Sequence, residues 1–93
     1  MKVKLNGFTY TLKFVKNLIH ADGTALWGEC DQPYKKGRGI RIEKALSPKN
    51  SLETIIHECL HGIDMDLPEA WVDKTAHDLA VVLWRLGYRK RAK

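Results

Sequence analysis

Alternating apolar and polar residues dominate the first fifteen positions of the chain. Segments 2–5 and 8–15 flank the pair Asn6-Gly7, and in the second segment aromatic and aliphatic residues alternate with threonine and lysine. A period of two is typical of a β-strand with one apolar face. Asn-Gly suits a type I′ turn, because both central residues of that turn need a positive φ. The pattern therefore predicts a β-hairpin whose apolar face must be covered.

Two shorter segments continue the strand pattern. Residues 25–31 are predicted to form a third strand, and residues 40–43, which alternate again, a fourth. Residues 32–39 between them contain one proline and two glycines and are predicted to form a loop. We expect a small antiparallel sheet of three to four strands over a β-rich region, residues 1–46.

A helical period replaces the alternation from residue 47 onward. Ser47 followed by Pro48 fits an N-cap and the first helical position, whereas Asn50 with Glu53 fits a capping box. Both alternatives begin one helix, predicted over 47–66.

A second helix is predicted over 67–88. It has Pro68 near its start and Gly87 as its stop, and a basic tail, 89–93, follows. The sequence thus predicts a single α+β domain over residues 1–93, with the sheet packed against two antiparallel helices.

The first helix carries the sequence His57-Glu58-Cys59-Leu60-His61 in its interior. Residues four apart lie one turn apart on the same side of a helix, so His57 and His61 can hold one zinc ion. Glu58 stands beside the first histidine, where it can act as the general base toward water. This motif predicts a zinc-dependent hydrolase, most readily a peptidase acting on a peptide or protein substrate.

Helical periodicity places the two histidines away from the apolar face. That face is predicted to consist of Leu52, Ile55, Ile56, Cys59 and Ile63. His57 and His61 fall on the opposite side, near Thr54 and Asp64, so the second helix must complete the site. The apolar stripe of the second helix is predicted to be Val72, Ala76, Leu79, Leu83 and Leu86.

Asp73 and His77 flank that second stripe, one turn apart, and both are zinc-ligand types. We predict Asp73 as the third metal ligand, with His77 as the alternative. Glu69 is a lesser candidate, since an acid in the first turn of a helix is favoured by the helix dipole alone.

The order of these elements resembles the small phage and bacterial zinc metallopeptidases with a minimal gluzincin-like domain, which are related to ImmA/IrrE-type peptidases. The resemblance rests on the strand at 40–43, the His-Glu-x-x-His helix and the segment 73–80, and it spans most of the chain. It implies a Glu as third ligand at the position of Asp73, with His77 where that family has Asn. A weaker similarity to SprT-like proteases, which act on DNA-bound protein, rests on His57, Glu58, His61 and a later histidine.

Chain size and charge leave two further classes open. In a domain of this size a metal ion can serve folding alone. The net charge is +5, with one cluster of basic residues at Lys35, Lys36, Arg38 and Arg41 and another at Arg85, Arg89, Lys90, Arg91 and Lys93. Such clusters attract acidic partners or nucleic acid, and beside the cleft the first would favour acidic substrates. The alternatives to a peptidase are therefore a non-catalytic zinc-stabilised module and a basic nucleic-acid-associated protein.

Remaining features of the sequence concern location and the reaction. No apolar run reaches the roughly 20 residues of a membrane span, and no secretory signal precedes the hairpin. We expect a cytoplasmic protein, in the bacterial host if phage-encoded, with Cys30 and Cys59 as free thiols. Candidate donors to a tetrahedral oxyanion are His20, Tyr34, Arg38 and Tyr88.

Overall fold

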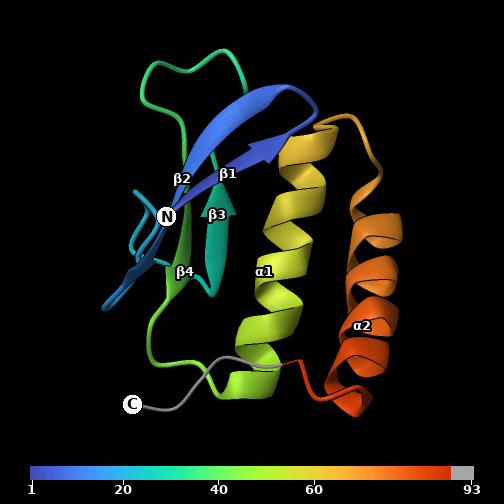
Figure 1. Cartoon of the computed structure of the whole chain (residues 1–93). Helices are drawn as coiled ribbons and strands as arrows, with labels where there is room; N and C mark the ends of the chain where they lie inside the picture. The colour runs from blue at the N-terminus through green and yellow to red at the C-terminus, as the bar shows by residue number, and fades with distance from the viewer. Residues whose placement is uncertain (89–93) are drawn as a thin grey trace.

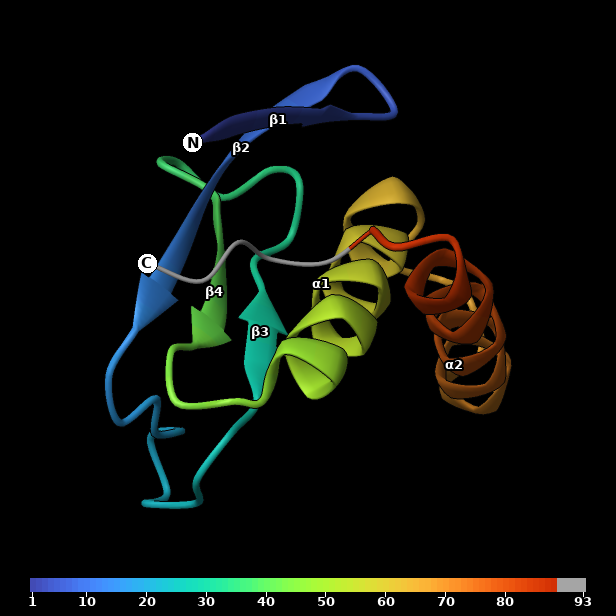
Figure 2. The same ribbon diagram turned by 60° about the horizontal axis from the view of Figure 1, so that its bottom comes forward.

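Four strands and two helices form three layers in the computed structural model, which describes residues 1–88. In chain order they are β1 (Lys2–Leu5), β2 (Phe8–Val15), β3 (Gly28–Cys30), β4 (Gly39–Glu43), α1 (Pro48–Ile63) and α2 (Glu69–Arg85). Helix α1 lies between the sheet and α2 (Figures 1 and 2). The predicted α+β class is confirmed.

The sheet is mixed rather than antiparallel, which corrects the prediction. Its strand order is β1-β2-β4-β3, with β4 parallel to β2 and antiparallel to β3. Strand β4 lies between β2 and β3, although β3 precedes it in the sequence. This central position explains why Ile40 and Ile42 are fully buried. An alternating pattern identifies a strand but does not determine the direction of its neighbour.

The N-terminal hairpin forms as predicted. Asn6 and Gly7 have φ values of 49° and 86°, the positive angles that a type I′ turn requires. The Asn6 amide also donates a hydrogen bond to the Ile63 carbonyl oxygen, 3.2 Å away, at the end of α1. The turn therefore ties the hairpin to the helix that covers it.

Strand β3 is shorter than the predicted segment 25–31. Ala25 forms an isolated bridge with Ile19, so the start of the predicted segment pairs with the preceding loop instead of with the sheet. The Trp27 carbonyl accepts a hydrogen bond from the Glu43 amide at 2.7 Å, and regular pairing with β4 begins at Gly28. The result is a short edge strand directly beside α1.

The main hydrophobic core lies between the sheet and α1. Its buried centre consists of Tyr10, Leu12, Ile40 and Ile42. Half-buried residues packed against this centre are Val3, Leu5, Phe14, Cys30, Leu46, Ile55 and Cys59. The apolar face of β2 and the interior of β4 thus meet one side of α1, as a half-covered sheet requires.

Helix α1 begins at the first of the two predicted caps. The Ser47 hydroxyl accepts a hydrogen bond from the Asn50 amide at 3.2 Å, and Pro48 occupies the first turn. The helix ends at Ile63, and residues 64–66, which the predicted range included, belong to the connection to α2.

The side of α1 turned to the sheet differs from the predicted apolar face. Its buried residues are Ser51, Thr54, Glu58 and Gly62, while Ile55 and Cys59 pack on the core and Ile63 is 43% exposed. Two glycines permit this close approach. A Cβ on Gly28 would lie 2.7 Å from Thr54 Cγ2, and a Cβ on Gly62 would lie 2.6 Å from Leu5 Cδ1.

Helix α2 packs on α1 through a stripe that is rotated from the predicted one. Val72, Ala76 and Ala80 are buried, whereas Leu79 and Leu86 are 44% and 67% exposed. Small alanine side chains let the two helices approach closely. Gly87, with φ of 91°, ends the helix as predicted, because the Gly87 and Tyr88 amides donate to the Trp84 and Leu83 carbonyls.

Within residues 1–88, neither α1 nor α2 has the length and apolar character that crossing a membrane requires. Of the C-terminal basic cluster, Arg85 lies within α2, and residues 89–93 lie outside the described part of the chain.

Candidate metal centre

The histidines of the predicted motif converge on one point. His57 and His61 lie one turn apart on α1, and their Nε2 atoms are 3.1 Å from each other. Their side chains are 21% and 18% exposed, so both are accessible at the rim of the α1–α2 interface. The predicted pairing of these two residues is present in the structure.

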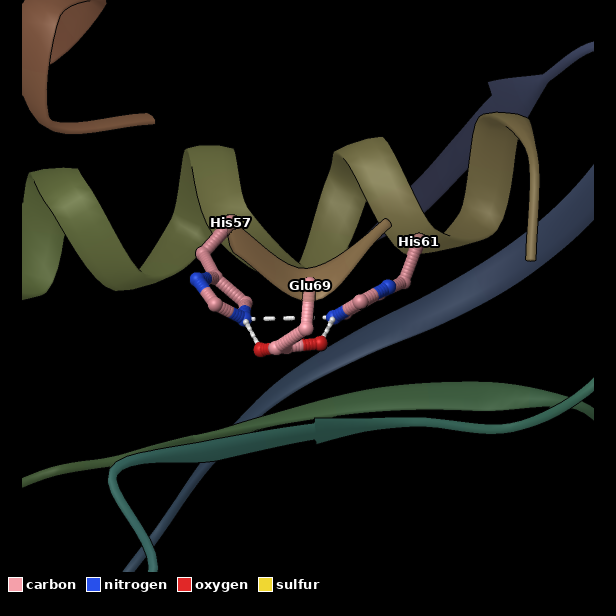
Figure 3. A group of neighbouring side chains, drawn as sticks. All are labelled: His57, His61 and Glu69. Carbon is pink, nitrogen blue, oxygen red and sulfur yellow. Dashed lines mark hydrogen bonds and ion pairs between the residues drawn. The ribbon is translucent and has the colours of Figure 1, made fainter. Parts of the chain in front are cut away.

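Glu69, the first residue of α2, completes the group (Figure 3). Its Oε1 lies 3.0 Å from His57 Nε2, and its Oε2 lies 3.1 Å from His61 Nε2. Tetrahedral ligands held about 2.1 Å from one zinc ion lie roughly 3.4 Å apart. Two imidazole nitrogens and a carboxylate at these separations could therefore hold a metal ion.

Neither residue predicted as the third ligand belongs to this group, and the acid that lies with the two histidines is Glu69, the lesser candidate. Asp73 Oδ1 lies 3.1 Å from His57 Nδ1, on the far side of the imidazole from Nε2. His77 Nδ1 instead contacts Glu53 Oε1 at 2.9 Å. Asp73 can hold the His57 tautomer whose Nε2 is free to bind a metal.

Rotation of α2 about its axis explains this difference. The buried residues Val72, Ala76 and Ala80 follow Glu69 by three, seven and eleven positions. That spacing places Glu69 on the same side of the helix, toward α1. If the buried stripe had been centred on the alanines, the sequence would have predicted this position of Glu69. The prediction centred the stripe on the leucines because they are larger and more apolar.

Glu58 is buried on the side of α1 that faces β3. It is 8% exposed, and within residues 1–88 its carboxyl group has no hydrogen-bond or ion-pair partner. Burial raises the pKa of Glu58 to about 7, with Glu69 and Glu29 adding to the increase and His57 opposing it. A carboxyl group with a pKa near neutrality can both accept and return a proton.

We call His57, His61 and Glu69 the metal group. A cleft of about 290 Å³ adjoins it. Its lining residues are Trp27, Gly28, Glu53, Thr54, His57, Glu58 and Asp73. Because β3 contributes to this wall, the site lies where the sheet edge, α1 and α2 meet, not on the side away from the sheet. The prediction that α2 takes part in the site agrees with this arrangement.

The four candidate oxyanion donors lie elsewhere. His20, Tyr34, Arg38 and Tyr88 are absent from the described lining of the cleft. Arg38 donates to the Pro33 and Thr9 carbonyls at 2.6 and 3.0 Å, and its guanidinium lies 5.3 Å from the centre of the Phe8 ring. His20 contacts Asp22 in its own turn.

Two members of the basic cluster of residues 35–41 are paired with carboxylates, and none of the cluster lines the cleft. Arg41 donates to Asp31 at 2.7 and 3.1 Å and also bonds to Glu29, while Lys35 Nζ lies 3.3 Å from Asp31 Oδ1. The expectation that this cluster would select acidic substrates at the cleft therefore loses its basis.

Cys30 and Cys59 are free thiols, as predicted. Burial raises the pKa of Cys30 to about 12 and also raises that of Cys59, with the nearby Glu58 carboxylate adding to both increases. Both residues pack against the main core. Their environment is that of structural rather than reactive cysteines.

No protein-family model, curated protein or solved structure matches this chain.

Proposed function

We propose that this protein is a zinc-dependent metallopeptidase. The observation that carries the proposal is the convergence of His57, His61 and Glu69 on one point, beside a cleft that His57 and the buried Glu58 line. A zinc ion held by these three residues would supply a Lewis acid that makes water more acidic and polarises a carbonyl. Two histidines and one carboxylate are a donor set typical of catalytic zinc.

Each protein group then has a defined task. Asp73 accepts the hydrogen of His57 Nδ1 and fixes the direction of the ring. Glu58 accepts a proton from the attacking water and returns it to the leaving amine. Its burial supports this role, because a carboxylate poorly compensated by neighbours is a stronger base.

The number of converging donors favours catalysis over a purely structural metal site. Structural zinc sites are usually closed by four protein ligands, whereas catalytic sites keep one position open. Among residues 1–88, three donors converge, and Asp73 and His77 contact His57 and Glu53 instead.

The test joins metal analysis with hydrolysis. Purified protein is expected to hold about one equivalent of zinc, and His57→Ala is expected to lose it. Glu58→Gln should keep the metal while its peptide hydrolysis falls about 10²- to 10⁴-fold, as expected for loss of a general base. Full zinc retention in His57→Ala, or full hydrolysis in Glu58→Gln, would disprove the proposal.

A further inference from the structure

The cleft extends from the metal group along α1 toward the start of that helix. Glu53 lies four residues before His57, and both line the cleft. One helical turn separates them by about 6 Å along the helix axis. A substrate bound with its reacting carbonyl near the metal group would therefore place a neighbouring long side chain beside Glu53.

The charges of this cleft are of one sign. Its lining contains the carboxyl groups of Glu53, Glu58 and Asp73 and no Lys or Arg of the described chain. The Glu53 side chain is 39% exposed, and its Oε1 atom contacts His77 Nδ1 at 2.9 Å. A carboxylate so exposed can accept further hydrogen bonds from a ligand cation.

Two further features indicate that a ligand belongs here. Trp27 is 54% exposed while lining the cleft, and an exposed indole face attracts cations. Glu58 is more than nine-tenths buried, faces the same cleft and has no hydrogen-bond partner within residues 1–88. An unpaired carboxyl group that is buried beside other carboxylates is costly unless the bound state compensates it.

We propose that the cleft selects substrates carrying a lysine or arginine side chain next to the bond that is cleaved. The cationic group would bind the Glu53 carboxylate, with its aliphatic stem or charged end against Trp27. An extended lysine or arginine side chain spans roughly the same 6 Å as one helical turn. This inference rests on the proposed peptidase function, since that function places the reacting carbonyl near the metal group.

Binding and hydrolysis are measured separately. Zinc-loaded Glu58→Gln is titrated by calorimetry with acetyl-Ala-Arg-Ala-amide and with the same peptide containing citrulline, which is nearly isosteric with arginine but neutral. We expect the arginine peptide to bind at least about tenfold more tightly. Adding Glu53→Gln should abolish this preference, whereas adding Asp78→Asn, which removes a charge outside the cleft lining, should leave it unchanged.

The outcomes distinguish this inference from the function on which it rests. Equal binding of both peptides, a preference that survives Glu53→Gln, or an equal loss in both charge variants would overturn the inference. If wild-type protein hydrolyses both peptides equally, the peptidase proposal stands and the basic specificity fails. If the preference is present without any hydrolysis by wild-type protein, the cationic binding site stands and the peptidase proposal fails.

Discussion

Two groups of carboxylates in this protein differ in the cations that face them. On the sheet, Asp31 and Glu29 share the guanidinium of Arg41, which bonds to both of them. The hydrogen bond from Arg41 is the main cause that lowers the pKa of Asp31 to about 2. This group is electrostatically complete within the chain and acts as a structural cross-link between neighbouring strands.

The carboxylates that lie close to His57 or line the adjoining cleft have no such partner. Within residues 1–88, Glu58, Glu69 and Asp73 have no Lys or Arg in an ion pair, and the contacts of Glu69 and Asp73 are with histidines. Burial raises the pKa of Glu58 to about 7 in this setting. The comparison teaches that similar acidic residues form a structural cross-link where an arginine lies between them, and stay without a Lys or Arg partner among the described residues where none does.

The largest expected effect concerns the residue that the structure places against both histidines. Glu69→Gln removes the carboxylate from the group, so zinc affinity should fall by more than about 100-fold. Competition with a chromogenic chelator measures this affinity, and Asp78→Asn on the same helix is the matched control. Unchanged zinc affinity in Glu69→Gln would show that another residue is the third metal ligand.

A smaller loss is expected for the residue behind His57. Asp73→Asn weakens the acceptor at His57 Nδ1 without removing a donor from the metal group, so zinc affinity should fall about 10- to 100-fold. The same chelator competition measures it. A loss larger than that of Glu69→Gln would reverse the assignment and support Asp73 as the direct ligand.

Substitution of Asp31, in the cluster that Arg41 forms on the sheet, should change the free energy of unfolding rather than the metal affinity. The pKa of Asp31 falls from 3.8 to about 2 on folding, and each tenfold change in proton binding is worth about 1.4 kcal/mol. Asp31→Asn should therefore lower the free energy of unfolding by about 2 kcal/mol at neutral pH.

The pH dependence of that difference follows from the lowered pKa. The stabilisation is fully present above pH 3.8, the value of the unfolded chain, and is lost as the pH falls through 2. Urea unfolding at several pH values should thus show wild type and Asp31→Asn converging toward pH 2. Asp66→Asn, at an exposed position, should stay within about 0.5 kcal/mol of wild type throughout. A difference that persisted at pH 2 would contradict the assigned role of Asp31.

The smallest effect is expected at Arg38, which lies against the hairpin. Arg38→Lys removes the planar group that bonds to two carbonyls and covers the Phe8 ring, and should cost about 1 kcal/mol in unfolding free energy. Lys36→Met, at an exposed neighbouring position, removes a charge as the control and should leave stability nearly unchanged. Arg38→Lys keeps the positive charge, so a loss no larger than that of Lys36→Met would show that the Arg38 contacts contribute little to stability.

Local signals in the sequence predicted local features well. Four confirmed features each depend on residues within about five positions of one another. They are the Asn6-Gly7 turn, the Ser47 cap, the helix end at Gly87 and the shared side of His57 and His61. The backbone angles and helical spacing that fix them are properties of the chain itself. Predictions of this kind were confirmed.

Features that depend on distant residues were predicted less well. One such feature is the parallel pairing of β2 with β4, and another is the burial of Thr54 and Glu58. Both depend on contacts with residues far away in the sequence, which a local pattern cannot identify. Gly28 lets α1 approach the edge strand so closely that polar side chains occupy the contact. Larger apolar residues such as Ile63 are left partly outside.

By itself, the sequence determined the α+β class and the three motif residues His57, Glu58 and His61, because strand alternation and helical spacing are local. The tertiary structure decided which acid joins the two histidines. Helix α2 packs through Val72 and its alanines, and this rotation turns Glu69 toward the group and sets Asp73 behind His57. Helix rotation is fixed by the shape of the two packed surfaces, which the order of residues does not reveal.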